Sequence, residues 1–197
     1  MLIVGAGNLG VHMLDQLIQN AYGKEIAFYD DNLSLPDTLY NQYRIIKNPI
    51  VLREFLQQEH DYITAVGHSR LREKLTHKIS TFGGVLTSII SKNSLIISTF
   101  STIGCGCFLQ AGCAVSHDVE IGESCIMHSN TLISHGVRIG KYVTIGPNVT
   151  ILKNVIIEDY TTLGPNVTIM PNVRIGANAL ISLGLTVNDD VVKNQTM

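Results

Sequence analysis

From residue 97 onwards, a large apolar residue recurs at every sixth position of the chain, and no polar residue interrupts the series. A second stripe of small or β-branched residues lies four positions further on. A period of six fits neither an amphipathic helix nor one long alternating strand. It predicts a β-solenoid, in which short strands point one apolar residue inward and stacked coils share a continuous core. The first series is Ile97, Ile103, Leu109, Val115, Ile121, Met127, Ile133, Ile139, Ile145, Ile151, Ile157, Leu163, Ile169, Ile175, Ile181 and Val187, and the second is Cys107, Cys113, Val119, Cys125, Thr131, Val137, Val143, Val149, Val155, Thr161, Val167, Val173 and Ala179.

The first third of the chain has a different pattern. An apolar strand at residues 1–4 leads into a glycine-rich turn and then into a helical pattern, and a second strand at 26–29 ends in two acidic residues. A strand, glycine turn and helix in this order can hold a phosphate at the helix N-terminus. An acid after the second strand suits a ribose hydroxyl. A tight turn without a ligand is the alternative interpretation. The expected substrate-binding residues here are Gly5, Gly7, Asn8, Gly10, Asp30 and Asp31.

Further strands and helices alternate up to about residue 95, which predicts a small Rossmann-like parallel α/β domain. His68 follows a strand, at the sheet edge where such folds bind ligands, so it joins the expected substrate-binding residues. Leu71, Leu75 and Ile79 are expected to share one helix face. The predicted elements are strands at 43–46, 62–66 and 85–90, helices at 50–59 and 69–81, and a loop at 32–42. The predicted domains are 1–95 (α/β), 96–192 (β-helix) and 193–197 (short tail).

The net charge and the positions of the cysteines limit which partners and sites we expect. The net charge is −2 and no basic stripe occurs, so no nucleic-acid partner is expected. There is no apolar run of membrane-spanning length and no leader pattern, so we expect a cytoplasmic protein without membrane insertion. Cys107, Cys113 and Cys125 fall on the small-residue stripe and are expected to be structural thiols, whereas Cys105 lies off it.

The six-residue series, the glycine-rich turn and the stretch LISHGVRIGKYVTIGPNVTI together carry a family resemblance. The chain resembles the bacterial sugar acetyltransferases that include sialic acid O-acetyltransferases and UDP-4-amino-sugar N-acetyltransferases. The resemblance implies a left-handed parallel β-helix with three hexapeptides per coil, a homotrimer, acetyl-CoA as co-substrate and no metal. It also implies a sugar or nucleotide-sugar acceptor in bacterial surface glycan biosynthesis. Transfer to nitrogen and transfer to oxygen both remain open.

The family's catalytic histidine motif corresponds to residues 134–140, so the resemblance implies His135 as the general base. A neutral imidazole can take a proton from an attacking amine or hydroxyl. The acid that usually follows the base is replaced by Gly136. The histidine that the family carries nine positions further on is replaced by Thr144, and a glycine usual in its coenzyme groove is replaced by Lys153. The sequence ends at Met197, where members of the family carry a further C-terminal tail. The expected coenzyme-binding residues are Thr144, Gly146, Lys153 and Gly164.

Three further hypotheses follow from the histidines. His117 and Asp118 lie one predicted coil before His135, and both join the expected catalytic residues under the hypothesis that Asp118 supplies the carboxylate that position 136 lacks. A plain polar turn at His117-Asp118 is the alternative. A zinc site of the γ-carbonic anhydrase type is an alternative, because His117, His128 and His135 lie close in sequence. A third reading, favoured by the departures from the motif, is a non-catalytic relative that keeps the trimer and the nucleotide pocket.

Overall fold

A computed structural model describes residues 1–96 and 100–197 of the chain. Ile97, the first member of the apolar series, lies outside the described residues. The chain forms two compact units, Met1–Ile89 and Ile90–Met197. The division falls before residue 95, where the sequence pattern changes. No helix in the described ranges is long and apolar enough to cross a membrane.

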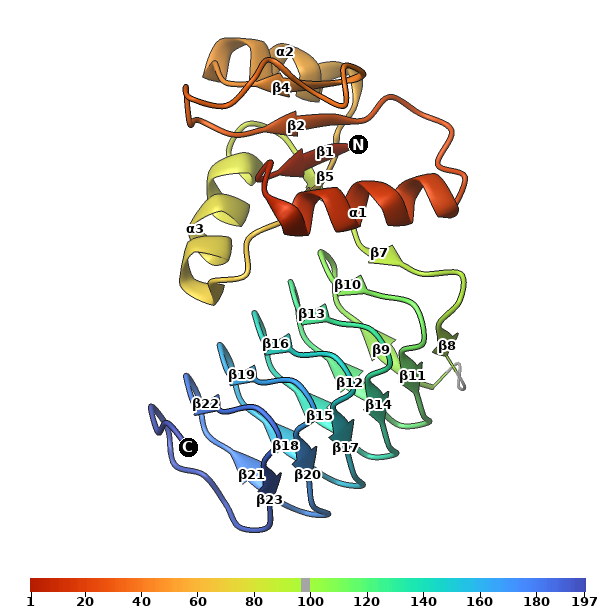
Figure 1. The fold of residues 1–197 in the computed structure, drawn as a ribbon, viewed down its shortest axis with the longest axis vertical. Coiled ribbons are helices and arrows are strands. Elements are labelled where there is room, and N and C mark those ends of the chain that lie inside the picture. Colours follow the sequence, from red (N-terminus) through yellow and green to blue (C-terminus); the bar gives the residue numbers. More distant parts are fainter. Residues whose placement is uncertain (97–99) are drawn as a thin grey trace. The chain divides into compact units, whose positions relative to one another are not determined.

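The first unit is a six-stranded sheet in the order β3-β4-β2-β1-β5-β6, with α-helices between strands (Figure 1). All its strand pairs are parallel except β3 with β4, which is antiparallel. The expected parallel α/β fold is therefore confirmed. The strands are β1 (Leu2–Val4), β2 (Ala27–Tyr29), β3 (Thr38–Leu39), β4 (Tyr43–Ile46), β5 (Asp61–Thr64) and β6 (Val85–Leu86).

The helices are α1 (Asn8–Gln19), α2 (Pro49–Gln58) and α3 (Ser69–Ser80). Asn48 caps α2, because its side chain accepts a hydrogen bond from the Ile50 amide next to Pro49 at the first helical turn. The buried side of α3 differs from the expected Leu71–Leu75–Ile79 face, since Leu71 is 46% exposed. Its buried residues are Arg72, Thr76 and Ile79.

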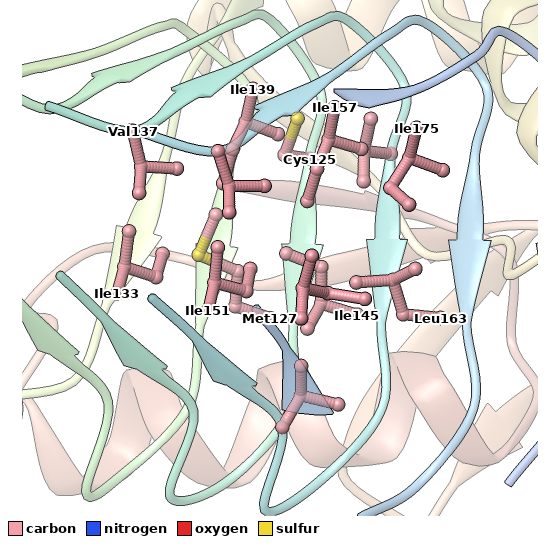
Figure 2. Packing of buried hydrophobic residues seen from close by; sticks show 14 of the residues in the cluster. Cys125, Met127, Ile133, Val137, Ile139, Ile145, Ile151, Ile157, Leu163 and Ile175 are labelled. Carbon is pink, nitrogen blue, oxygen red and sulfur yellow. The ribbon is translucent and has the colours of Figure 1, made fainter. Parts of the chain in front are cut away.

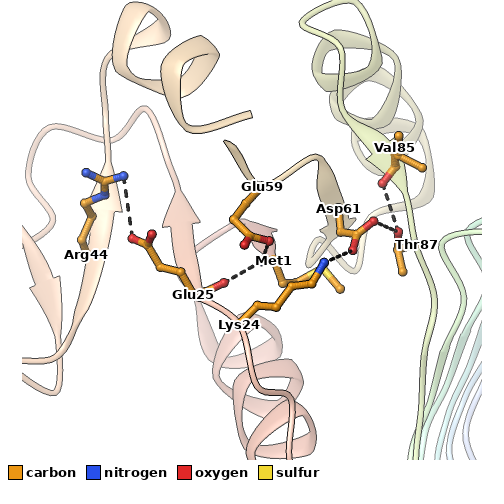
Figure 3. A network of polar contacts seen from close by, with 8 residues as sticks. All are labelled: Met1, Lys24, Glu25, Arg44, Glu59, Asp61, Val85 and Thr87. Carbon is orange, nitrogen blue, oxygen red and sulfur yellow. Dashed lines mark hydrogen bonds and ion pairs between the residues drawn. The ribbon is translucent and has the colours of Figure 1, made fainter. Parts of the chain in front are cut away.

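Polar contacts link strands and loops at one end of this sheet (Figure 3). The amine of Met1 donates to the Glu25 carbonyl over 2.6 Å and pairs with Glu59 at 3.6 Å. Nearby, the Thr87 hydroxyl donates to Asp61 over 3.1 Å. Because the Met1 amine is buried among these groups, burial lowers its pKa.

The second unit is a β-helix of two-residue strands in three parallel sheets (Figure 1). From Thr102 onwards, paired strands lie 18 residues apart, as Leu132 and Thr150 do, whereas Leu95 pairs with Ala114, 19 residues away. Sheet I contains β7 (Ile89–Ile90), β10 (Phe108–Leu109), β13 (Ile126–Met127), β16 (Thr144–Ile145), β19 (Thr162–Leu163) and β22 (Leu180–Ile181). Sheet II contains β8 (Leu95–Ile96), β11 (Ala114–Val115), β14 (Leu132–Ile133), β17 (Thr150–Ile151), β20 (Thr168–Ile169) and β23 (Thr186–Val187). Sheet III contains β9 (Thr102–Ile103), β12 (Glu120–Ile121), β15 (Arg138–Ile139), β18 (Ile156–Ile157) and β21 (Arg174–Ile175).

Both predicted stripes point into the β-helix, where Ile133, Ile151 and Met127 pack with their neighbours (Figure 2). Every described member of the two stripes is buried except the half-buried Ile103. Polar members of the small-residue stripe bond to backbone carbonyls, as Thr161 does to the Gly176 carbonyl at 3.1 Å and the Cys125 thiol to that of Gly140 at 3.1 Å. Their polarity is therefore satisfied inside the core. The expected β-solenoid is confirmed.

Three elements differ from the sequence-based predictions. The strand expected at 85–90 is two strands, β6 in the α/β sheet and β7 in sheet I. The loop expected at 32–42 contains β3. Residues 193–197, expected as a tail, continue the coil, because the Met197 amide donates to the Leu180 carbonyl and Thr196 pairs with Leu180.

Candidate active site

A column of polar residues forms at the corner where the chain leaves sheet II for sheet III. His117 follows β11, His135 follows β14 and Lys153 follows β17, so the 18-residue register places the three in order. Backbone hydrogen bonds fix that order. The Gly136 amide donates to the His117 carbonyl over 3.3 Å, and the Asn154 amide to the His135 carbonyl over 3.1 Å.

The two imidazole rings of this column are stacked. Their centroids lie 5.1 Å apart and their planes differ by 7°. This agrees with the strand spacing expected for residues one coil apart. The register predicted for His117 and His135 is therefore confirmed.

The carboxylate of this site belongs to His117. Asp118 Oδ2 lies 2.8 Å from His117 Nδ1, whereas His135 Nδ1 lies 3.4 Å from the Ser134 hydroxyl. Asp118 therefore does not support His135 as expected, but the other ring of the stack. The reason is local, because Asp118 turns the corner in the left-handed conformation (φ 56°) and stays beside the histidine that precedes it.

A side chain at position 136, where the family motif carries an acid, would have to displace the side chain of Asn154. Gly136 has φ +71°, and a Cβ at this position would lie 2.5 Å from the Asn154 side-chain oxygen. The Asn154 amide is held in turn by a 3.1 Å hydrogen bond to Asn172. A corner asparagine from the next coil thus lies in the space that a Cβ at position 136 would enter.

The four expected coenzyme-binding residues do not lie together within one chain. Lys153 is exposed in the histidine column. Thr144 belongs to β16 of sheet I, and Gly146 and Gly164 turn the corner between sheets I and II. A Cβ on Gly146 would lie 2.7 Å from the Pro165 nitrogen, so close packing of successive coils accounts for this glycine.

His128 lies at a different corner from the other two histidines, between sheets I and II. Its Nδ1 is 3.3 Å from the Gln110 side-chain oxygen. Three imidazoles must point at one position to bind catalytic zinc, and His128 does not join the stacked pair. No group of three metal-binding side chains occurs among the residues that the structure describes.

A cavity of about 240 Å³ opens at the carboxyl ends of β1 and β2 in the first unit. It brings together three of the expected substrate-binding residues, Gly5, Asp30 and Asp31. This is the edge of a parallel sheet at which α/β folds bind ligands. Its lining is Val4, Gly5, Tyr29, Asp30, Asp31, Val66, Leu71 and Leu75.

The two acids of this cavity have different partners. Asp30 accepts hydrogen bonds from the backbone amides of Ala6 and Asn32, each at 3.0 Å, so it supports the glycine-rich turn. Asp31 lies 3.5 Å from the ammonium of Lys78, which also donates to the Tyr29 hydroxyl over 3.0 Å. The hydrogen bond to Tyr29 raises the pKa of Lys78. Sequence reasoning missed Lys78, because it comes from α3, far along the chain.

The other expected substrate-binding residues of the first unit differ in how closely they are packed. A Cβ on Gly10 would lie 2.3 Å from the Gly5 carbonyl oxygen, so this glycine allows close packing. Gly7 has no atom within 4 Å of such a Cβ, and Asn8 beside it is exposed, so the turn is open to solvent there. His68 is exposed and caps α3 by accepting from the Leu71 amide over 3.3 Å.

A second cavity, of about 360 Å³, lies on the outer face of sheet III. Two ion pairs line it, Arg138 with Glu120 and Arg174 with Glu158. Hydrogen bonds from Arg174 and then from the Ala177 amide hold the pKa of Glu158 below its ordinary range. Since each arginine already has an acidic partner, the face is charged but internally paired.

Comparison with known proteins finds a family match for part of each unit. Residues 1–79 match the family described as the PglD N-terminal domain. Residues 100–135 and 154–182 match the bacterial transferase hexapeptide family, described as six repeats. No curated protein matches the chain.

Three solved structures share the fold over nearly the whole chain. WeeI from Acinetobacter baumannii AYE is 25% identical, with a TM-score of 0.88, 99% of this chain covered and 94% of that chain. The acetyltransferase domain of PglB from Neisseria gonorrhoeae FA1090, in complex with acetyl coenzyme A, is 20% identical, with a TM-score of 0.90 and coverage of 99% and 93%. Perosamine N-acetyltransferase from Caulobacter crescentus, a histidine variant in complex with CoA and GDP-perosamine, is 23% identical, with a TM-score of 0.88 and coverage of 99% and 91%.

The two family matches agree with the two compact units, and the structural likeness extends over both. The chain is therefore similar to the PglD N-terminal domain family over residues 1–79 and to the bacterial transferase hexapeptide family over much of its β-helix.

Proposed function

We propose that this protein transfers an acetyl group from acetyl-CoA to an amino or hydroxyl group of a nucleotide-linked sugar in bacterial surface glycan biosynthesis. The observation that carries the proposal is the stacked His117–His135 pair at a corner of a hexapeptide β-helix. The solved relatives that bind CoA or acetyl coenzyme A have the same fold and support the proposal. The reaction takes place in the cytoplasm, where acetyl-CoA is available.

The α/β unit is proposed to bind the nucleotide end of the acceptor. The cavity at Gly5 and Asp31 supports this role, because it combines an open glycine-rich turn with a charged rim. Lys78 adds an ammonium beside Asp31 that can contact a phosphate or a ribose hydroxyl. Asp30 supports the turn rather than contacting the ligand.

The β-helix is proposed to bind the acetyl donor. Lys153, exposed next to His135 in the column, offers a positive charge for a CoA phosphate. One imidazole of the stacked pair takes the proton of the attacking group, for which the sequence motif nominates His135. A backbone amide at the corner holds the developing oxyanion. Thr144, Gly146 and Gly164 lie at other positions of the coil, and they serve the donor site in a homotrimer, in which a neighbouring chain completes it.

Exposed apolar side chains on sheet II support the trimer. Leu95 and Leu132 are 67% and 44% exposed, and both pair with the strand of Ala114, so they form one apolar strip. We propose that a neighbouring chain covers this strip in the trimer.

Calorimetric titration with acetyl-CoA tests the donor site directly. We expect micromolar binding, corresponding to about −8 kcal/mol. A screen of UDP-, GDP- and dTDP-linked amino sugars for release of free CoA then identifies the acceptor. Absence of acetyl-CoA binding would refute the proposal.

A nucleotide-sugar-binding protein without acetyl transfer is the second candidate. The observation that favours it is the loss of an acidic residue beside His135, since Asn154 lies in the space that a Cβ at position 136 would enter. In that case UDP- or GDP-sugars alone bind to the protein, and acetyl-CoA does not.

A further inference from the structure

The inner side of α3 carries a fully buried arginine. Arg72 is 0% exposed, and it shares this side of the helix with Thr76 and Ile79. An arginine keeps its charge when it is buried, and burying a charge is costly, so its hydrogen-bond partners indicate its role. We infer that Arg72 is a positioning residue that shapes one wall of the cavity at the carboxyl ends of β1 and β2. This inference rests on the proposed binding of a nucleotide-linked sugar by the α/β unit.

Two partners of Arg72 are consecutive backbone carbonyls in the loop between β5 and α3. Its Nη1 donates to the Val66 carbonyl over 2.8 Å and to the Gly67 carbonyl over 2.9 Å. The Arg72 amide donates to the His68 carbonyl over 2.9 Å. One residue of the helix therefore holds three successive carbonyls of the loop from its inner side.

The loop that Arg72 holds forms part of the proposed nucleotide site. Val66 lines the cavity. The same loop packs against the glycine-rich turn, because a Cβ on Gly5 would lie 2.9 Å from the Ala65 carbonyl oxygen and 3.4 Å from Val66 Cγ2. A shift of the loop would therefore change the cavity wall and its contact with the turn together.

The arginine also determines which backbone groups the loop presents outward. In a planar trans peptide group, the carbonyl and the following amide point in opposite directions. Since the carbonyls of Val66 and Gly67 are turned toward the guanidinium, the amides of Gly67 and His68 are turned away from it. Gly67 and His68 are both exposed. Loss of the guanidinium would release these two peptide groups and change the donors beside the cavity.

A neighbouring residue on the same helix side provides a matched control. The Thr76 hydroxyl shares a 2.9 Å hydrogen bond with that of Thr64, and the Thr76 carbonyl accepts from the Tyr62 hydroxyl over 2.8 Å. These buried contacts fix α3 on β5 without involving the loop. Thr76→Val therefore removes a buried hydrogen bond of α3 and leaves the contacts of Arg72 with the loop in place.

Calorimetric titration of the full-length protein with UDP, GDP and dTDP tests the role of Arg72. Arg72→Met keeps an unbranched side chain and removes the hydrogen bonds to both carbonyls. We expect it to raise the Kd of the nucleotide that the unmodified protein binds best by about 10- to 100-fold. Arg72→Lys keeps a charged donor group and should raise this Kd by only about 3- to 10-fold. Thr76→Val should lower the melting temperature and leave the Kd unchanged.

Steady-state kinetics separate positioning from general damage. Arg72→Met should raise the KM for the nucleotide sugar, while kcat and the KM for acetyl-CoA stay within about 3-fold of the unmodified values. Only the cavity wall depends on Arg72, whereas acetyl-CoA is proposed to bind the β-helix. An equal rise in Kd in Arg72→Met and Thr76→Val would show a general structural role and overturn the inference.

Hydrogen exchange gives a second measurement if Arg72→Met does not fold. The amides of residues 66–68 should exchange faster in Arg72→Lys than in the unmodified protein, and the best-binding nucleotide should slow them in both. Unchanged exchange and an unchanged Kd in Arg72→Lys would overturn the inference. If the unmodified protein binds none of the three nucleotides, the proposed nucleotide site itself fails, which is a separate result from normal binding in the variants.

Discussion

The carboxylate of Asp30 accepts a hydrogen bond from the backbone amide of Ala6 over 3.0 Å. This contact joins the end of β2 to the glycine-rich turn after β1, and the Asn32 amide adds a second bond to the same carboxylate. The sequence pattern predicts that an acid in this position binds a ribose hydroxyl. In the structure, Asp30 instead stabilises the glycine-rich turn through these hydrogen bonds.

Replacing Asp30 by alanine should destabilise the α/β unit. Loss of two hydrogen bonds to a charged group is expected to cost about 1.5–3 kcal/mol. Asp31→Ala is the matched control, because Asp31 is 72% exposed and its pair with Lys78 contributes under about 1 kcal/mol. Urea denaturation of both variants checks this, and equal losses would contradict the assigned role of Asp30.

Gly10→Ala should destabilise the same unit through overpacking. Its Cβ would lie 2.3 Å from the Gly5 carbonyl oxygen and 3.2 Å from the Phe28 ring, and the carbonyl is backbone that cannot rotate away. The expected cost is about 1–3 kcal/mol. Gly7→Ala is the control, since it has φ −84° and open space around the new methyl group. Thermal unfolding checks this, since the melting temperature should fall in Gly10→Ala and stay near the wild-type value in Gly7→Ala.

Gly136→Ala should lower the free energy of unfolding by about 1–3 kcal/mol. The left-handed backbone conformation disfavours a Cβ, and the new Cβ would lie 2.5 Å from Asn154 Oδ1. In an Asn154→Gly background, the loss of stability caused by Gly136→Ala should be smaller by on the order of 1 kcal/mol. Glycine adopts the left-handed conformation of residue 154 and removes the side-chain oxygen that the new Cβ would meet. A double-mutant cycle measured by denaturant unfolding gives the coupling. Strict additivity would show that Asn154 does not occupy the space at position 136.

Glu158→Gln should change the stability of the β-helix in acid. The native pKa of Glu158 is lowered by Arg174, so the ion pair stabilises the fold above the ordinary value near 4.5 and is lost as pH falls through the lower native value. Wild type should therefore melt about 2–4 °C above the variant at pH 6, with the difference vanishing near pH 3. Glu54→Gln, at an exposed helical site, should show no such convergence. A pH-independent difference would contradict the ion-pair assignment.

The sequence predicts the β-helix well because one repeated physical requirement, an inward apolar residue every six positions, sets the whole unit. The same register brings His117 onto His135, since residues one coil apart must stack. The α/β unit is also predictable, because buried strands and amphipathic helices alternate. The boundaries of this unit are harder to predict. The pattern at 85–90 does not reveal that two short strands in this range join different sheets.

Side-chain partners could not be read from the sequence in the same way. Asp118 is one residue from His117 and one coil from His135, and only the corner conformation decides which ring it meets. Lys78 reaches Asp31 from a helix that follows it by more than forty positions. Neither contact has a periodic signal, because each depends on a single turn or helix orientation.

Residues 18 positions apart occupy equivalent places in successive coils, as Leu132 and Thr150 do. Evolution can therefore duplicate or delete one coil without changing the backbone geometry around a corner. The same corner geometry recurs in successive coils, so a residue 18 positions from any corner residue occupies the matching place in the neighbouring coil.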